Sequence, residues 1–372
     1  MVKIPDPALI GARRAPRRLA VAAAGVALSV AIMLILSGMR AGFEQSVVAL
    51  VENTPAHLWV SDPAVDTVSN VFSLIDEGAA AALRKHPDVE AVHSLYAVPV
   101  MADVEGRKRP LMLYGYDVAG GAGGPWRLAE GNRPAADDEI VVDVIFAEQY
   151  GLRIGGTLKL LGGEFRITGL SAGTSSFMNT SIFAARTEVA RRIAAPGQTS
   201  FLLVGLRPGA DGQKARDETA ALVPGLKVRT RAEMAAATLD NIGGVMQGPF
   251  RLLIGIAFVV GLLTTALMLY ITTLEKNGEY QVLRALGGTP ALLSRLVLEE
   301  AALVGLAGAA LGLAITVLAA RGLAVSAPLY PVVLTPPVVV RTLLLVAVLA
   351  AGGALVPIRR VLRLDPSAAL RG

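Results

Sequence analysis

The sequence contains no cysteine among its 372 residues, and it contains only three histidines. The absence of cysteine excludes disulfides, thiolate metal sites and cysteine nucleophiles. The histidines, His57, His86 and His93, are not spaced as metal ligands, and no His-Glu-x-x-His sequence occurs. We therefore predict no metal site and no bound cofactor.

A phosphate-binding P-loop is also missing. Such a loop ends in Lys followed by Ser or Thr, whereas the seven lysines here precede Ile, His, Arg, Leu, Ala, Val and Asn. The chain therefore does not bind ATP through a P-loop, and any energy for work comes from another chain or from an ion gradient. Transporters driven by gradients normally carry ionisable residues deep in several spans. The middles of the apolar runs are uncharged, which favours an external motor.

Enzyme motifs are nearly absent. Residues 169–173 match Gly-x-Ser-x-Gly, but a serine hydrolase of that type needs a histidine after the serine, and all three histidines precede Ser171. We interpret this segment as the end of a strand followed by a turn. The acidic run Asp137-Asp138-Glu139 is expected in a solvated turn, with a calcium loop as the less favoured alternative. We predict no catalytic residue and conclude that the chain is not an enzyme.

Charged residues are few, at 17% of the chain, whereas 53% of residues are hydrophobic and the mean hydropathy is +0.55. The charge is also uneven: residues 41–248 hold 19 Lys/Arg and 24 Asp/Glu, and the remainder holds 16 against 6. Because the basic excess flanks apolar runs, it indicates membrane topology and contact with anionic lipids. It does not indicate a nucleic-acid partner.

Four apolar runs are each long enough to cross a bilayer, for which about 20 residues suffice. The first run follows the basic N-terminus, so a signal peptide is an alternative to a retained span. The run is long, and no small-x-small cleavage site follows it before Arg40, which favours the span. Basic residues before this run and in the tail (Arg359, Arg360 and Arg363) place both termini in the cytoplasm by the positive-inside rule.

The predicted fold class is an α-helical membrane protein of four transmembrane helices, with a mixed α+β extracytoplasmic domain inserted between helices 1 and 2. Along the chain we expect a cytoplasmic N-terminus (1–18), a first span (19–38), a stalk helix (39–55), the extracytoplasmic domain (56–230), a second stalk helix (231–250), a second span (251–274), a cytoplasmic coupling helix (275–295), a third span (296–320), an outer loop (321–337), a fourth span (338–358) and a cytoplasmic tail (359–372).

Alternation and β-branched residues predict the strands of the inserted domain. The expected strands are His57–Ser61, Val89–Val104, Pro110–Tyr116, Thr157–Leu161, Glu164–Leu170, Thr180–Ala184, Phe201–Leu206 and Lys227–Thr230. The expected helices are Asp76–Lys85, Val144–Tyr150, Thr187–Ala194 and Gly212–Leu222. The glycine-rich segment Gly120–Pro125 is a candidate boundary between two subdomains.

The third span carries Glu299 and Glu300 near its start. Acids inside a membrane are functional candidates, but at this depth they reach water or first-turn amides, so we favour a structural role. Further along, Gly305, Gly308 and Gly312 stand at the spacing of small residues in closely packed helices. These glycines predict a helix–helix contact.

The cytoplasmic segment 275–295 is a short charged helix that ends at two glycines and a proline, between two spans. A polar element held at the membrane surface by two spans is suited to receive a displacement from a soluble partner. The alternative is that its charges are only solvated.

The sequence resembles the MacB/FtsX-type permeases of the ABC transporter superfamily. The segment Glu275-Lys276-x-x-Glu279-Tyr-x-Val-Leu-Arg284-Ala-Leu-Gly287-Gly is similar to the cytoplasmic helix of that family, with Lys276, Tyr280 and Gly288 as departures. The third span, the ending Asp365-Pro366-Ser-Ala-Ala-Leu370-Arg371, and outer segments around Gly131 and Tyr150 also resemble the family. Without a fused ATPase, the chain is closest to stand-alone DevC-like or LolC/LolE-like subunits.

This resemblance implies a permease that acts by mechanotransmission and moves a hydrophobic or amphipathic substrate from the outer leaflet or periplasm. It implies a bacterial inner-membrane location, an ABC ATPase subunit dimer, a second permease copy (identical or paralogous), membrane lipids, and a periplasmic adaptor as a further partner. The implied ATPase-docking residues are Glu275, Lys276, Glu279, Leu283, Arg284, Leu286 and Gly287.

Two other functions stay open. An FtsX-like regulator transmits ATPase motion to an extracytoplasmic partner without transport. A membrane-anchored enzyme is disfavoured by the missing motifs.

Overall fold

The computed structural model describes residues 16–68, 73–175 and 180–363, without the side chains of 16–19 and 242–246. The basic residues before position 16 and the ending Asp365–Arg371 therefore lie outside the described residues. The chain forms two compact units. One comprises residues 1–42, 247–327 and 331–372, and the other comprises 43–246 and 328–330.

The first unit is helical. Among the described residues, four helices are long and apolar enough to cross a membrane: α2 (Pro16–Asn53), α7 (Arg231–Glu275), α9 (Pro290–Ser326) and α10 (Pro336–Leu362). Helices α2 and α7 supply residues to both units. Proline at the first position starts α9 and α10, where its missing N–H costs nothing. This arrangement confirms the predicted fold class of four spans with a domain inserted between the first two.

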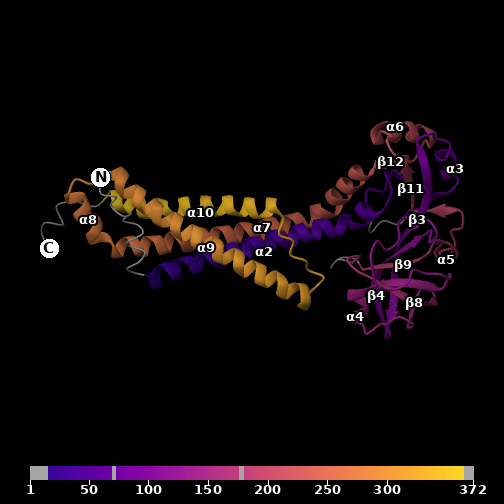
Figure 1. Ribbon diagram of the computed structural model, residues 1–372, viewed down its shortest axis with the longest axis horizontal. Helices are drawn as coiled ribbons and strands as arrows, with labels where there is room; N and C mark the ends of the chain where they lie inside the picture. Colours follow the sequence, from indigo (N-terminus) through magenta and orange to yellow (C-terminus); the bar gives the residue numbers. More distant parts are fainter. Residues whose placement is uncertain (1–15, 69–72, 176–179, 364–372) are drawn as a thin grey trace. The chain divides into compact units, whose positions relative to one another are not determined.

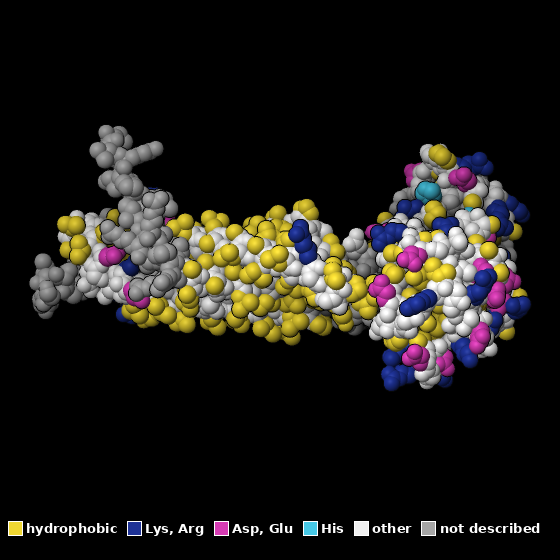
Figure 2. Space-filling model, turned by 60° about the horizontal axis from the view of Figure 1, so that its bottom comes forward, with side chains coloured by type: hydrophobic (Ala, Val, Ile, Leu, Met, Phe, Trp, Pro, Cys, Tyr) yellow, Lys and Arg dark blue, Asp and Glu magenta, His cyan; other side chains and the backbone are white. Residues whose placement is uncertain are grey.

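The surface of the helical unit is apolar. Figure 2 shows hydrophobic side chains over most of the helices, whereas charged side chains gather on the other unit. Only 22% of the most apolar stretch of α7 is buried within the chain. Leu252, Leu263 and Leu267 on this helix are each more than half exposed. Such a surface requires lipid or a second membrane subunit around it.

Helix α9 packs against its neighbours through glycine. A Cβ at Gly308 would lie 2.5 Å from Val26 Cγ1 on α2, and one at Gly312 would lie 2.8 Å from the carbonyl oxygen of Ala27. A Cβ at Gly305 would lie 3.2 Å from the Ala350 Cβ on α10. These glycines therefore allow the backbones to approach closely.

The second unit is built on a large mixed sheet. In the described part of the chain, ten strands form one sheet in the order β12-β1-β11-β3-β4-β9-β6-β8-β5, with β7 paired to β3 and β8. Its strands are β1 (Leu58–Ser61), β3 (Val89–Val104), β4 (Arg107–Tyr116), β5 (Leu128–Gly131), β6 (Glu139–Asp143), β7 (Thr157–Leu160), β8 (Gly163–Ser171), β9 (Ser181–Ala185), β11 (Phe201–Leu206) and β12 (Lys227–Thr230). The short strands β2 (Ile75–Asp76) and β10 (Gln198–Thr199) pair separately.

Strands β3 and β4 form a long hairpin, with Val104 opposite Arg107. Its two turn residues, Glu105 and Gly106, both have positive φ, of 53° and 77°. A two-residue turn of this kind matches the twist of paired strands, and glycine adopts it without strain. The sixteen residues of β3 thereby link distant parts of the sheet. The segment Gly120–Pro125 was expected to separate two subdomains, but the sheet is continuous across it.

Helices α3 (Ala79–Leu83), α4 (Val144–Gln149), α5 (Arg186–Arg192) and α6 (Gly212–Leu222) complete the unit. The first and last pack with Val89, Val92 and Leu206 in one apolar cluster. Helices α4 and α5 contribute Phe146 and Val189 to another. Each predicted helix is present, although α3 is shorter than expected.

One prediction for this domain is wrong. Glu139 does not lie in a solvated turn: it is the first residue of β6 and is only 5% exposed. Its carboxylate pairs with Arg166 and accepts hydrogen bonds from the backbone N–H groups of Ala135 and Ala136. These partners satisfy the buried charge. Asp137 and Asp138 do lie in an exposed turn, and Asp137 accepts a hydrogen bond from Thr187 at 2.8 Å.

Asp66 fastens the loop after β1 to β12. Its Oδ1 lies 3.0 Å from Lys227 Nζ and also contacts Arg229, whose guanidinium donates to the Val65 carbonyl at 2.8 Å. The hydrogen bond from Lys227, with smaller contributions from the charges of Lys227 and Arg229, lowers the pKa of Asp66 below its usual 3.8, although burial opposes this. Ionised Asp66 is therefore favoured in the folded domain.

Replacing Asp66 by asparagine should lower the free energy of unfolding at pH 7 by less than about 1 kcal/mol, because the side chains of Asp66 and Lys227 are each nearly half exposed. The melting temperature should therefore fall only slightly. Because the pKa of Asp66 is lower in the folded state than in the unfolded state, ionised Asp66 stabilises the fold at pH values above its unfolded-state pKa. This stabilisation is lost as the pH falls through the folded-state pKa. The wild-type and variant melting curves should therefore converge below about pH 4. A gap that persists or widens in acid would contradict this role.

Candidate docking site

The predicted coupling segment folds as a short helix joined to α7. Helix α7 ends at Glu275, and α8 comprises Asn277–Ala285. The backbone N–H of Lys276 donates to Thr272 at 3.1 Å, and that of Tyr280 donates to the Lys276 carbonyl at 3.0 Å. Lys276 is therefore bonded to the last turn of α7 through its N–H and to the first turn of α8 through its carbonyl. A displacement of α8 has a short covalent and hydrogen-bonded route into α7.

Two glycines end α8 in a defined way. Gly287 has φ of +91°, its N–H donates to the Arg284 carbonyl at 3.1 Å, and the N–H of Gly288 donates to the Leu283 carbonyl at 2.9 Å. This pair of bonds is a Schellman motif, in which glycine provides the left-handed residue. Thr289 then accepts from the N–H of Leu292 and caps α9. The sequence Gly-Gly-Thr-Pro therefore reverses the chain within four residues.

The inner face of α8 is apolar. Tyr280, only 5% exposed, packs in a cluster with Leu269 of α7, Leu293 and Val297 of α9 and Val361 of α10. Leu283 is partly buried against the same cluster. Sequence reasoning treated Leu283 as an anchor for a partner, whereas the structure turns it inward. The importance of Tyr280 was missed, because burial of one face depends on helices far along the chain.

The outer face of α8 carries acidic and apolar side chains. Glu275 and Glu279 are exposed. Val282 is 54% exposed and Leu286 is 83% exposed, although both are large and apolar. They stand four residues apart and so lie on one side of the helix end. Val282 is a surface residue that the sequence analysis did not select.

The remaining predicted residues contact other helices of the same unit. Lys276 Nζ lies 2.9 Å from Glu300 Oε1 of α9. Arg284 Nη1 donates to the Leu362 carbonyl at the end of α10, at 3.1 Å. A cation there is favourable, because the last carbonyls of a helix carry partial negative charge. Glu299 pairs with Arg295 one turn earlier at 2.7 Å.

The serine of the Gly-x-Ser-x-Gly sequence is fully buried. Ser171 Oγ lies 2.7 Å from Thr174 Oγ1, which donates to the buried carboxylate of Asp143 at 2.6 Å. The other oxygen of Asp143 accepts from the N–H of Ile145 and caps α4. These polar groups satisfy one another inside the domain, as a strand end and turn require. A substrate has no access to Ser171.

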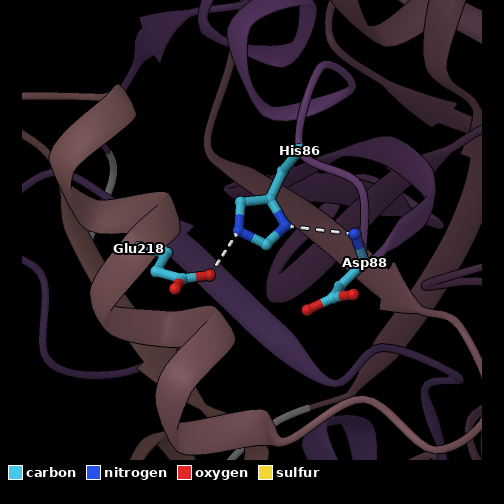
Figure 3. A group of neighbouring side chains, drawn as sticks. All are labelled: His86, Asp88 and Glu218. Carbon is cyan, nitrogen blue, oxygen red and sulfur yellow. Dashed lines mark hydrogen bonds and ion pairs between the residues drawn. The ribbon is translucent and has the colours of Figure 1, made fainter.

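Figure 3 shows a cluster of three metal-ligating residue types, His86, Asp88 and Glu218. His86 Nδ1 accepts a hydrogen bond from the N–H of Asp88 at 3.2 Å, so Nδ1 carries no proton and the ring proton is on Nε2. Nε2 faces Glu218 at 3.0 Å. A metal bound to Nε2 would require the ring proton to be on Nδ1. That proton would then face the N–H of Asp88, and the hydrogen bond between Asp88 and Nδ1 would be lost. We therefore assign His86 to joining the loop after α3 to α6.

Two family descriptions match consecutive parts of the chain. Residues 19–222 match the MacB-like periplasmic core domain, and residues 251–366 match the FtsX-like permease C-terminal family. The chain is 24% identical over 368 residues to the uncharacterized ABC transporter permease Rv0072 of Mycobacterium tuberculosis, with 96% of each chain covered. It is 24% identical over 364 residues to the uncharacterized ABC transporter permease Mb2592 of Mycobacterium bovis, again with 96% of each covered.

Among solved structures, the periplasmic region of MacB from Actinobacillus actinomycetemcomitans aligns with a TM-score of 0.40 and 14% identity. This alignment covers 53% of the present chain and 95% of the MacB fragment. The extracellular domain of the transporter YknZ from Gram-positive bacteria aligns with a TM-score of 0.37 and 11% identity, covering 47% and 99% of the two chains.

Proposed function

Since this chain belongs to the MacB/FtsX-type family of ABC transporter permeases, we propose that it is the membrane subunit of an export system driven by an ATPase that docks on α8. A permease of this superfamily is a multi-pass bacterial membrane protein that works with an ATPase subunit and a partner permease. In this proposal the ATPase is a separate chain, which is supported by the lack of a P-loop in these 372 residues.

The observation that carries the proposal is the composition of the outer face of α8. Leu286 is 83% exposed beside Val282, and the exposed acids Glu275 and Glu279 lie one to two turns earlier. Exposed apolar groups next to charges are typical of a protein interface, because a few anchoring residues usually carry most of the binding energy. The docking surface is therefore Glu275, Glu279, Val282 and Leu286, with Gly287 ending it.

The proposed mechanism is mechanotransmission. ATP-driven closure of the ATPase dimer displaces α8, and the displacement passes into α7 through the helical hydrogen bonds at Lys276. Helix α7 begins at Arg231, directly after the last strand of the inserted domain, so one helix, which contains Pro249, connects the docking surface to that domain. Coupled motion of packed helices is a common form of conformational change.

In this scheme both termini and α8 face the cytoplasm of a bacterial inner membrane, and the inserted domain faces the periplasm. The substrate is hydrophobic or amphipathic and is taken from the outer leaflet or the periplasm. Lipids cover the apolar helices, and a periplasmic adaptor binds the inserted domain. The ten-stranded sheet is larger than a tether requires, which favours transport over a purely regulatory role.

Reversing the charge of one docking residue tests the proposal. Wild-type protein, solubilised from its native membranes, should capture a nucleotide-binding ATPase subunit, whereas Glu279→Arg should capture roughly tenfold less, as expected for loss of one interface anchor. Glu90→Arg, a matched reversal on the exposed side of β3, should behave as wild type. Failure of wild-type protein to capture an ATPase in any mild detergent would contradict the proposal.

A further inference from the structure

The corner between α7 and α8 is held by an ion pair that joins distant parts of the chain. We propose that Lys276 and Glu300 brace this corner, so that a push on α8 moves α7 instead of bending the chain between them. The inference rests on the proposed function, since it concerns how the docking surface transmits its displacement. It assigns Lys276, predicted from the sequence as a docking residue, to a positioning role.

The backbone at Lys276 is the place where bending is expected. Its φ and ψ are −87° and 8°, outside helical values, and it separates α7 from α8. The backbone hydrogen bonds at this corner end on Lys276 itself, and one irregular residue between two helices is a natural hinge. A side-chain contact at the same residue therefore controls the angle between the helices.

The pair is placed to fix that angle. Lys276 Nζ and Glu300 Oε1 are 2.9 Å apart, and the side chains are only 27% and 15% exposed. Glu300 lies within α9, whose position is set by packing against α10 and α2. The ammonium is therefore directed at an anchored acid within the same unit and is largely covered from a docking partner.

Removing Lys276 or Glu300 from the pair should destabilise the corner by more than the loss of an ordinary, exposed surface ion pair would. A largely covered carboxylate that loses its cation keeps the cost of desolvation without the compensating charge. The local structure then relieves the cost by moving Glu300 toward water or by opening the corner. Both changes loosen the connection between α8 and α9 while leaving the outer face of α8 intact.

The chain provides a matched control in the neighbouring pair. Arg295 and Glu299 are 2.7 Å apart, but both lie on α9 and Arg295 is 75% exposed. This pair joins one turn of a helix to the next and spans no corner. Arg295→Met therefore removes a comparable ion pair near the same membrane surface without touching the proposed brace.

The test measures docking and transmission separately. The sequence has no cysteine, so Ala236→Cys on the exposed side of α7 provides a single labelling site. Spin labels there report the distance between the two permease copies of the complex, with and without ATP, in nanodiscs. The variants Lys276→Met, Lys276→Arg, Glu300→Gln and Arg295→Met are compared with the otherwise unaltered labelled protein.

We expect Lys276→Met and Glu300→Gln to capture the ATPase as wild type does, while the ATP-dependent change in the ratio of the two distance populations falls by about fivefold or more, the factor that corresponds to the lower end of typical coupling free energies. Lys276→Arg should restore most of the change, and Arg295→Met should retain it. A full change in both Lys276→Met and Glu300→Gln would overturn the brace. If a folded Lys276→Met variant failed to capture the ATPase, the proposed brace would also be wrong and Lys276 would be a docking residue. If the wild-type protein failed to capture the ATPase, the proposed function itself would be wrong.

Discussion

Replacing Gly308 by leucine is expected to destabilise the helical unit by at least about 2–3 kcal/mol, the upper range for overpacking a close contact. The reason is backbone proximity. A Cβ at Gly308 would stand 2.5 Å from Val26 Cγ1 and 3.2 Å from the carbonyl oxygen of Ala23. A leucine therefore forces α9 away from α2, and the cluster that includes Val26, Val30 and Val304 loses its packing. Thermal unfolding of the purified protein in detergent measures the effect.

The matched control is another glycine of the same helix. A Cβ at Gly322 meets no atom within 4 Å, so Gly322→Leu should unfold near the wild-type temperature. Both substitutions add the same apolar volume to α9, and only their surroundings differ. Equal melting temperatures for the two variants would show that α9 does not pack on α2 as described.

Replacing Leu286 by aspartate should reduce ATPase capture by about tenfold or more, which corresponds to roughly 1.4 kcal/mol or more of binding energy. Leu286 is 83% exposed, so an aspartate is accommodated without disturbing the helix, and the free protein should remain folded. In the complex, the new charge would replace an apolar anchor and would be desolvated. Quantifying the co-purified ATPase against the permease measures this loss.

Leu222→Asp provides the corresponding control. Leu222 is the last residue of α6 in the inserted domain and is 42% exposed, so its replacement adds the same charge to an exposed leucine. ATPase capture by this variant should match that of the wild type. A comparable loss in both variants would point to a general effect of charge on the complex and would remove α8 from the interface.

Strands with a clear hydrophobic pattern could be predicted from the sequence, whereas short strands without such a pattern could not. Strand β3, with its sixteen mostly apolar residues, and β11 have the predicted bounds. Strand β6 was missed because it is only five residues long and opens with Glu139 directly after two aspartates, which suggested a turn. Its burial depends on Arg166, which lies on a different strand. Local composition carries no information about such a partner.

The candidate site divides in the same way. The position of the short helix and its end at Gly287 follow from local signals, since two glycines and a proline end a helix wherever it lies. Local signals do not show which residues of this helix face a partner. Leu283 lies on the nine-residue helix α8 and Leu286 directly follows it, yet Leu283 packs against the cluster around Tyr280 and Leu286 is exposed. That difference is set by α9 and α10, which are distant in the sequence.

The most direct test of the account is site-specific photo-crosslinking in native membranes, with a photoreactive amino acid at Leu286 and, separately, at Leu222. We expect the residue at 286 to crosslink to a chain that carries a P-loop, identified by mass spectrometry, and the residue at 222 not to do so. Crosslinks from 286 only to lipid, to this chain itself or to proteins without a nucleotide-binding motif would contradict ATPase docking on α8.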